Sequence, residues 1–182
     1  MKLIGITGKA GSGKDTVADY LVREHGFIKY SLAAPLKAML KAIGVPCETQ
    51  EEKAAINPIF GVTNRYMAQS LGTEWMRECI AQDGWLRLAR RFIDTQRELS
   101  RLSEDGTPGG VVVADIRYDN EAQMIRSMGG TIWRIERGSA DIAGAHVSEA
   151  GIDPALVDRW IHNAHTINDL IYKVSFHLSN NQ

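Results

Sequence analysis

The sequence has few cysteines, no excess of positive charge and no long apolar run. Its 182 residues include two cysteines, Cys47 and Cys79, too few for the disulfide framework of a small secreted protein. We expect both to be reduced and to pack as small apolar side chains. The 21 Lys and Arg residues are balanced by 22 Asp and Glu residues, which gives a formal net charge of −1. This balance argues against a broadly basic nucleic-acid-binding protein and against an acidic disordered chain.

No segment approaches the ~18 consecutive apolar residues of a membrane span. The first residues, 1–5, enter a strand pattern at once and lack the apolar stretch and cleavage site of a signal peptide. We therefore expect neither export nor membrane insertion, and a cytoplasmic protein. A chain of this length can bury about 70% of its unfolded surface, so we expect a single domain that needs no disulfide or metal to fold.

Strand and helix patterns alternate along the chain. Short apolar strands are expected at 2–7, 27–31, 111–115, 131–135 and 159–162. Helices are expected at 14–25, 35–43, 66–80, 85–102, 120–128 and from 166 onwards. Prolines, glycines and polar residues predict an irregular segment over 44–64. The alternation predicts an α/β fold with a mostly parallel central sheet, in which ligands bind at the carboxyl ends of the strands.

A glycine-rich turn separates the first expected strand from the first helix. It reads Gly8-Lys9-Ala10-Gly11-Ser12-Gly13-Lys14 and fits the pattern G-x-x-x-x-G-K. The glycines let consecutive backbone N–H groups turn towards phosphate oxygens, and the helix N-terminus adds the positive end of a dipole. Lys14 adds a mobile charge for the β- and γ-phosphates. The sequence therefore predicts a nucleotide-phosphate site in this loop.

Three further residues are candidates for the metal that accompanies a nucleotide. Asp15 stands after Lys14, where the full motif has Ser or Thr, and Thr16 comes next. Asp15 could hold Mg²⁺ through water or simply favour the helix N-terminus. Thr16 could serve the phosphate and metal site or be an ordinary helix residue. Asp115 ends the run 111–115, as a Walker-B acid would, and could orient the hydrated Mg²⁺ or cap the next turn.

Arginines are concentrated in the middle of the chain. Eleven of the 13 lie between residues 65 and 137, where eleven acids balance them, so this span lacks the basic excess of a non-specific nucleic-acid surface. Arg instead suits forked contacts with phosphate. Arg117 lies two residues past Asp115, at the ligand edge of the sheet. Arg134 and Arg137 flank the end of a strand that leads into 138–144. A mobile loop there could close over two phosphoryl groups, or both arginines could be surface charges.

The expected helix 85–102 carries five arginines at three- and four-residue spacings from acids, which we interpret as a solvated face. Its apolar residues predict one buried face. These residues are Trp85, Leu88, Ala89, Phe92 and Leu99. The same face could belong to the core or form a homodimer contact, and the sequence leaves both alternatives open.

Five segments together resemble the P-loop nucleoside monophosphate kinases, and among them the deoxynucleoside monophosphate kinases of bacteriophages. They are Gly8–Thr16, Ala34–Lys37, Arg65–Arg77, Asp115–Ala122 and His146–Glu149. The resemblance implies a three-layer P-loop NTPase fold. It also implies transfer of the γ-phosphoryl group of ATP, with Mg²⁺, to a small-molecule acceptor, a deoxynucleoside monophosphate (dNMP). A phage-encoded protein of this family would act in the host cytoplasm.

The same resemblance implies roles for individual residues. A helical acceptor-binding region would cover about 34–102, and a short lid about 137–150. Arg65 and Arg77 would hold the acceptor phosphate and Gln69 could read its base, unless all three are ordinary helix surface. Lys37 is a further candidate. Asp115 would border the acceptor, and Lys14 would bridge the donor phosphates. Three arginines would stabilise the transferring group: Arg117, Arg134 and Arg137.

The tail Trp160–Thr166 is similar to the last strand and loop of dephospho-coenzyme A kinases, where the loop lies near the donor adenine. Asn163 is therefore a candidate donor-binding residue, or a plain turn asparagine. Ala34 stands where relatives often carry an acid, so no carboxylate base is available there. An anionic phosphate acceptor needs none. Two alternatives remain: another small-molecule P-loop kinase, such as a dephospho-coenzyme A kinase, and a nucleotide-binding switch without an acceptor.

Overall fold

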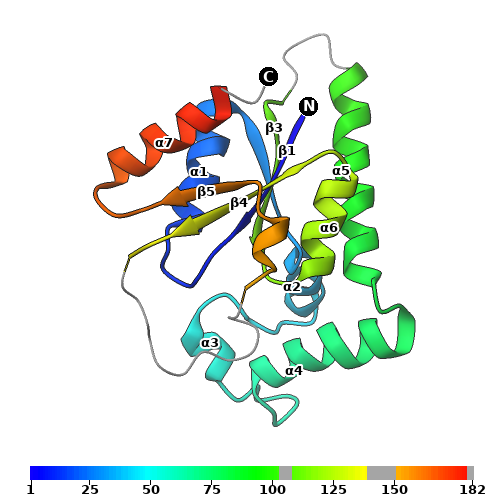
Figure 1. Cartoon of the computed structure of the whole chain (residues 1–182). Coiled ribbons are helices and arrows are strands. Elements are labelled where there is room, and N and C mark those ends of the chain that lie inside the picture. The colour runs from blue at the N-terminus through cyan, green and yellow to red at the C-terminus, as the bar shows by residue number, and fades with distance from the viewer. Residues whose placement is uncertain (103–107, 139–150, 180–182) are drawn as a thin grey trace. The chain divides into compact units, whose positions relative to one another are not determined.

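The computed structural model describes residues 1–102, 108–138 and 151–179 (Figure 1). The chain divides into two compact units. The first comprises Met1–Ser31 and Phe92–Gln182, and the second comprises Leu32–Arg91. Most of the expected lid, residues 139–150, lies outside the described residues, and so does the resembling segment 146–149.

The first unit contains a five-stranded sheet in which every described strand pair is parallel. The strand order is β2-β3-β1-β4-β5. The bounds are β1 Lys2–Thr7, β2 Phe27–Ser31, β3 Gly110–Ile116, β4 Thr131–Glu136 and β5 Arg159–His162. The sequence predicted all five strands to within one residue at each end. β1 and β3 are central strands with helices on both faces, which is why they are almost entirely apolar and buried.

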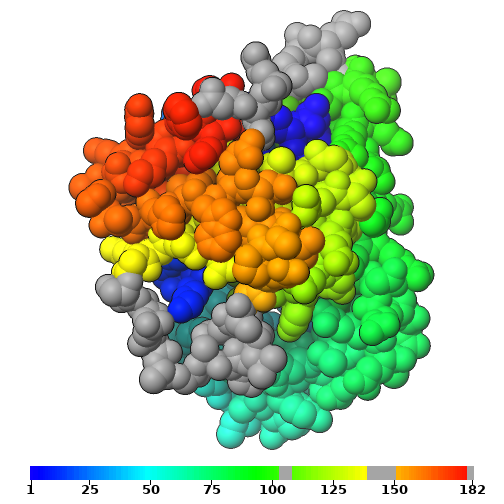
Figure 2. Space-filling view, in the orientation of Figure 1, coloured from blue at the N-terminus to red at the C-terminus, as the bar shows by residue number. Residues whose placement is uncertain are grey.

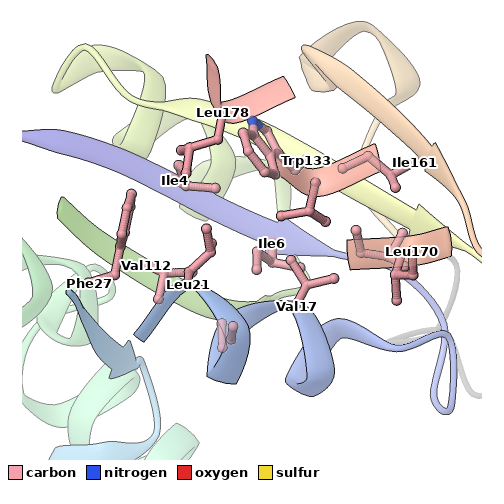
Figure 3. Close-up of a cluster of buried hydrophobic side chains, with 14 residues drawn as sticks. Ile4, Ile6, Val17, Leu21, Phe27, Val112, Trp133, Ile161, Leu170 and Leu178 are labelled. Atoms are coloured by element: carbon pink, nitrogen blue, oxygen red, sulfur yellow. The ribbon is translucent and has the colours of Figure 1, made fainter. Parts of the chain in front are cut away.

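Helices cover both faces of this sheet, which makes three layers (Figure 1). Helices α1 (Lys14–His25) and α7 (Ile167–Ser179) lie on one face, and α6 (Asp119–Ser127) lies on the other with the end of α5 (Gly84–Leu102). Figure 3 shows the core between the sheet, α1 and α7, where residues such as Ile6, Leu21 and Leu170 meet. Burying each such side chain stabilises the fold by about 1.5–3 kcal/mol.

The second unit is helical. It contains α2 (Ala34–Ala42), α3 (Gln50–Ala54), α4 (Asn64–Ser70), the π-helix η1 (Leu71–Ile80) and the first residues of α5. Helix α3 lies inside the segment expected to be irregular. It begins at a capping box in which the Thr49 hydroxyl accepts from the Glu52 N–H and the Glu52 carboxylate accepts from the Thr49 N–H. The spacing Thr-x-x-Glu was the signal in the sequence that could have predicted this helix.

Two expectations about packing are wrong in part. On α5, Trp85 and Ala89 are buried as expected, but Leu88 is 37% exposed and Leu99 is 53% exposed. The buried row continues instead through Ile93, because residues four apart lie nearly above one another on a helix. Of the cysteines, Cys47 packs in the core of the second unit, whereas Cys79 is exposed. Among the described helices, none has both the length and the apolar character required to cross a bilayer.

Candidate active site

The phosphate loop, residues 8–13, joins β1 to α1 at the carboxyl edge of the sheet. Gly8 and Gly13 have φ angles of 140° and 106°, which side chains rarely adopt. A Cβ on Gly8 would lie 2.3 Å from the Ile135 carbonyl oxygen, and one on Gly13 would lie 2.9 Å from Asn163 Nδ2. Both glycines are therefore required by the turn and by close neighbours. In Figure 2 atoms of this loop, in blue, reach the surface beside the end of β4, in yellow.

Ser12 gives an independent sign that the loop holds a polar ligand. Its residue is 3% exposed, and within the described part of the chain its Oγ has no hydrogen-bond partner. A buried hydroxyl without a partner is costly unless a ligand completes its hydrogen bonding. The α1 N-terminus adds the positive end of the helix dipole at the same place. The loop therefore fits the phosphate chain of a nucleotide.

The Lys14 side chain folds back over this loop. Its Nζ donates to the carbonyl oxygens of Gly8, at 2.6 Å, and Lys9, at 2.9 Å. It also lies 3.6 Å from Asp115 Oδ1. Carbonyl groups thus hold the ammonium group above the loop, where it can exchange them for phosphate oxygens.

Asp115 reaches Lys14 because β3 is distorted. Gly5 pairs with Val113 while Thr7 pairs with Ile116, so two residues of β3 lie opposite one residue of β1 in a β-bulge. Among the described residues, Asp115 is the one non-glycine residue with a positive φ angle, 64°. Such backbone strain costs about 1–3 kcal/mol and is typical of functional sites. The bulge therefore directs a carboxylate towards the phosphate loop.

Arg117 is held by the same carboxylate. Its Nε and Nη2 donate to Asp115 Oδ2 at 2.8 and 2.5 Å. Burial opposes the charged guanidinium, but the hydrogen bonds and charge of Asp115 outweigh it and raise the pKa of Arg117. The buried Glu121 carboxylate accepts from the backbone N–H groups of Arg117, at 2.8 Å, and Tyr118, at 3.2 Å. Sequence reasoning missed Glu121, although its position in the first turn of a helix was a signal for such a contact.

Arg134 is fixed by two residues that sequence reasoning also missed. Its side chain is 15% exposed, and its Nε lies 3.2 Å from Glu136 Oε1. Its guanidinium lies 5.1 Å from the ring centroid of Trp160, within the range of a cation–π contact. Glu136 lies on the same strand face as Arg134. Trp160, on β5, is the residue that pairs with Arg134 in the strand register. The contact with Trp160 can be found only from the strand register.

The structure brings most of the expected donor-side residues around the loop. One hollow is lined by Lys14, Asp115, Arg117 and Arg134, together with residues of the loop and Gly151. A second, of about 350 Å³, is lined by Asp15, Thr16, Arg137 and Asn163, among others. A third, of about 270 Å³, lies between the loop and the end of β4 and is also lined by Arg134 and Arg137. Each of these three hollows is lined in part by residues of the phosphate loop.

The expected metal residues offer no complete coordination shell. Asp15 is exposed, and its carboxylate lies 3.1 Å from Lys29 Nζ, which is also 2.9 Å from Asp19. Burial opposes the Lys29 charge, but hydrogen bonds to Asp19 and Asp15 outweigh it and raise the pKa of Lys29. Across the described residues, no cluster of three or more His, Cys, Asp or Glu side chains could hold a metal ion. Asp115 and Thr16 fit Mg²⁺ if phosphate oxygens and water complete its shell.

The expected acceptor residues lie in the second unit. Lys37 forms an ion pair with Glu48 at 2.6 Å, and Arg65 Nη2 donates to Gln50 Oε1 at 2.8 Å. Gln69 is exposed on α4, and Arg77 lies in η1.

The π-helix determines the face on which Arg77 lies. Met76 is 8% exposed and Trp75 is 40% exposed. If the α-helical turn of α4 continued without interruption, Trp75 would lie on the buried side of the helix and Met76 would not. An α-helix turns about 100° per residue, whereas i→i+5 hydrogen bonding lowers this to about 82°. Over the twelve residues from Arg65, the mixed helix returns Arg77 to within about 20° of the Arg65 direction, instead of about 120° away. Ideal turn angles therefore predict that Arg65, Gln69 and Arg77 share one side of the helix.

Solved structures share this fold. The dephospho-CoA kinase of Campylobacter jejuni has a TM-score of 0.57 and 11% identity, and the match covers all of both chains. A sugar kinase of Janibacter sp. HTCC2649 has a TM-score of 0.52 and 13% identity, over 100% of this chain and 96% of that one. The predicted α/β fold is confirmed. The parallel sheet with its phosphate loop and strand-end acid defines a P-loop protein of the three-layer α/β class.

Comparison with known sequences gives the family. The model of the deoxynucleotide monophosphate kinase family matches residues 2–59 and 46–174. A protein of Acanthamoeba polyphaga mimivirus that carries this name is 34% identical, over 82% of this chain and 81% of the relative. The deoxynucleotide monophosphate kinase of Enterobacteria phage T4 is 24% identical, over 96% of this chain and 97% of that relative. The chain belongs to the deoxynucleotide monophosphate kinase family, which confirms the predicted family and enzyme class.

Proposed function

We propose that the described site transfers the γ-phosphoryl group of ATP, with Mg²⁺, to the phosphate of a dNMP, giving ADP and the deoxynucleoside diphosphate. The observation that carries this proposal is the hollow shared by Lys14, Asp115, Arg117 and Arg134 beside the phosphate loop. Three cations and one acid around a loop that fits phosphate suit phosphoryl transfer, in which positioning and charge neutralisation supply most of the catalysis. Membership of the family supports the choice of acceptor.

On the donor side, backbone N–H groups of residues 8–13 and the Ser12 hydroxyl bind phosphate oxygens. Lys14 exchanges the carbonyl oxygens of Gly8 and Lys9 for the β- and γ-phosphates. Bound Mg²⁺ supplies neutralisation of the phosphate charge. The residues that would hold it, through water, are Asp115 and Thr16, and Asp15 would join them by leaving its ion pair with Lys29.

On the transfer side, Arg117, Arg134 and Arg137 neutralise the group in transit. The guanidinium of Arg134 is already oriented before substrate binds, because Glu136 and Trp160 hold it. The acceptor phosphate is itself an anion at neutral pH, so it needs no general base, which is consistent with Ala34 at the start of α2.

On the acceptor side, we propose that the region 34–102 binds the dNMP. Arg65 and Arg77 would hold its phosphate, Gln69 would contact its base, and Lys37 would add charge. The expected lid, at about 137–150, falls mostly outside the described residues. The enzyme would work in the cytoplasm, where its nucleotide substrates are found.

An acceptor panel tests the reaction. ADP formation from ATP and Mg²⁺ is measured with dTMP, dGMP, dCMP, dAMP and dephospho-coenzyme A. We expect turnover with at least one dNMP. Turnover with dephospho-coenzyme A alone would favour the other small-molecule kinase, and slow hydrolysis that no acceptor stimulates would favour a nucleotide-binding switch.

A lysine variant tests the site. Lys14→Ala removes a charge aimed at the transferring phosphates, and loss of one such group typically lowers turnover by about 10²–10³. Arg23→Ala, at an exposed position on α1 outside the proposed site, is the control and should leave kcat unchanged. Both variants should keep the thermal unfolding midpoint. Near-normal kcat in Lys14→Ala would contradict the assignment.

A further inference from the structure

Asn163 joins the last strand of the sheet to the phosphate loop. It follows β5 directly, and its backbone N–H donates to the Glu136 carbonyl at the end of β4, at 2.6 Å. Its side-chain Nδ2 donates to the Ser12 carbonyl oxygen at 2.9 Å, across 151 positions of sequence. A carbonyl oxygen can only accept, so the group facing Ser12 must be the amide nitrogen. Asn163 therefore connects the end of β4 to the loop.

This hydrogen bond fixes the orientation of one peptide group in the loop. The carbonyl of Ser12 and the N–H of Gly13 belong to the same planar trans peptide and point in opposite directions. While Asn163 holds the carbonyl on its own side, the Gly13 N–H must point away from Asn163. Gly13 is also the residue before Lys14, so the same contact sets where the helix and its lysine begin.

Packing makes this contact specific to the two residues involved. Gly13 has a φ angle of 106°, and a Cβ there would lie 2.9 Å from Asn163 Nδ2 and 3.2 Å from a methyl group of Leu170. Asn163 is itself only partly exposed. A side chain at position 13 therefore does not fit, and the hydrogen bond from Asn163 holds a peptide that glycine would otherwise allow to flip.

We infer that Asn163 is a positioning residue for the phosphate-binding loop, which acts on the donor phosphates through the Ser12–Gly13 peptide and not by contacting the nucleoside. The inference rests on the proposed function, in which this loop binds the phosphates of ATP. A preorganised N–H binds phosphate more strongly than one that must first rotate, because no reorganisation is needed. An aspartate would place an acceptor oxygen against the Ser12 carbonyl and so could not perform this role.

The test compares Asn163→Ala and Asn163→Asp with the intact enzyme. The readouts are the KM for ATP, the KM for the dNMP acceptor and the inhibition constant of tripolyphosphate, a probe that has phosphates and no nucleoside. We expect Asn163→Ala to raise the KM for ATP and the tripolyphosphate constant by a similar factor of about ten, the effect of one hydrogen bond. Asn163→Asp should raise both further, and the KM for the acceptor should not change.

Asn168→Ala, at an exposed asparagine in the first turn of α7, is the matched control and should change nothing. Two results would overturn the inference: unchanged constants in both Asn163 variants, or a raised KM for ATP with an unchanged tripolyphosphate constant, which would indicate contact with the nucleoside. Unfolding of both variants at the assay temperature would assign a purely structural role and would also overturn it. If the intact enzyme neither uses ATP nor is inhibited by tripolyphosphate, the proposed function itself fails.

Discussion

Asp115 combines two properties that a single substitution can separate. Its carboxylate lies between Lys14 and Arg117, and its backbone has a φ angle of 64° in a β-bulge. The charge organises the two cations, whereas the backbone conformation decides where the charge points. Asn tolerates this conformation better than most residues, because its short polar side chain can bond locally.

Asp115→Asn should therefore keep the fold and lose the function of the charge. We expect kcat to fall by about 10–100-fold, because Arg117 loses its ionic partner and the metal site loses its acid. Asp115→Ala should show a similar loss of kcat and a lower unfolding midpoint, since Ala is strained at this φ angle. Steady-state kinetics and thermal unfolding of both variants test this, and wild-type kcat in Asp115→Asn would contradict it.

At the scale of elements, the π-helix η1 is the feature with a functional consequence. It follows α4 without a break, and its wider turn keeps Met76 buried while bringing Arg77 to the side of Arg65 and Gln69. π-Helical segments are rare and occur frequently at functional sites. Moving the arginine by a single residue along η1 should therefore affect acceptor binding more than a change in the total charge of the helix would.

Exchanging Arg77 and the exposed Glu78 tests this geometry without changing composition. In Arg77→Glu/Glu78→Arg the arginine moves about 82° around the helix, away from the Arg65 side. We expect the KM for the dNMP to rise at least about tenfold, the loss of one charge-assisted contact, while the KM for ATP is unchanged. The matched control exchanges the adjacent residues Arg23 and Glu24, an exposed ion pair 2.6 Å apart on α1, and should leave both KM values unchanged. Equal acceptor KM values in the two exchange variants would contradict the proposed face.

At the scale of the whole molecule, the balance of charge has a local explanation. Acids pair with many of the cations, as Asp15 and Asp19 do with Lys29, and arginines gather near the phosphate loop. A chain with a net charge of −1 can therefore present a positive site to a small anion without a basic surface.

The stability of the first unit should depend on pH through His177. Burial in α7, with the positive charge of Arg159 as the second cause, lowers the pKa of His177 below its ordinary 6.5. The unfolded chain therefore binds this proton more readily, so the free energy of unfolding should decrease as the pH falls below about 6.5. Urea unfolding at pH 7.5 and at pH 5.5 gives the free energy of unfolding at each pH. Between these two pH values, this free energy should decrease less in His177→Gln than in the intact protein. An equal or larger decrease in the variant would contradict this assignment.

Local patterns in the sequence were enough to predict the strands, most of the helices and the phosphate loop. These features depend on local periodicity and on glycine spacing, which the chain carries directly: the run 111–115 predicts a buried strand, and residues 8–14 predict a phosphate site wherever the fold places them. The sequence also determined Asp115 and the arginines as candidates, because their positions at strand ends follow from the strand pattern. Helix α3 could have been predicted in the same way from its capping box.

Which groups meet, and how they are oriented, could be known only from the folded chain. The bulge at Asp115, the contact of Arg134 with Trp160 and the bond from Asn163 to Ser12 depend on the register of strands that are far apart in sequence. The direction of the Arg77 side chain depends on the π-helix η1, which the spacing of apolar residues in the sequence did not predict. Local patterns encode each element, whereas the geometry of the site arises from contacts between elements.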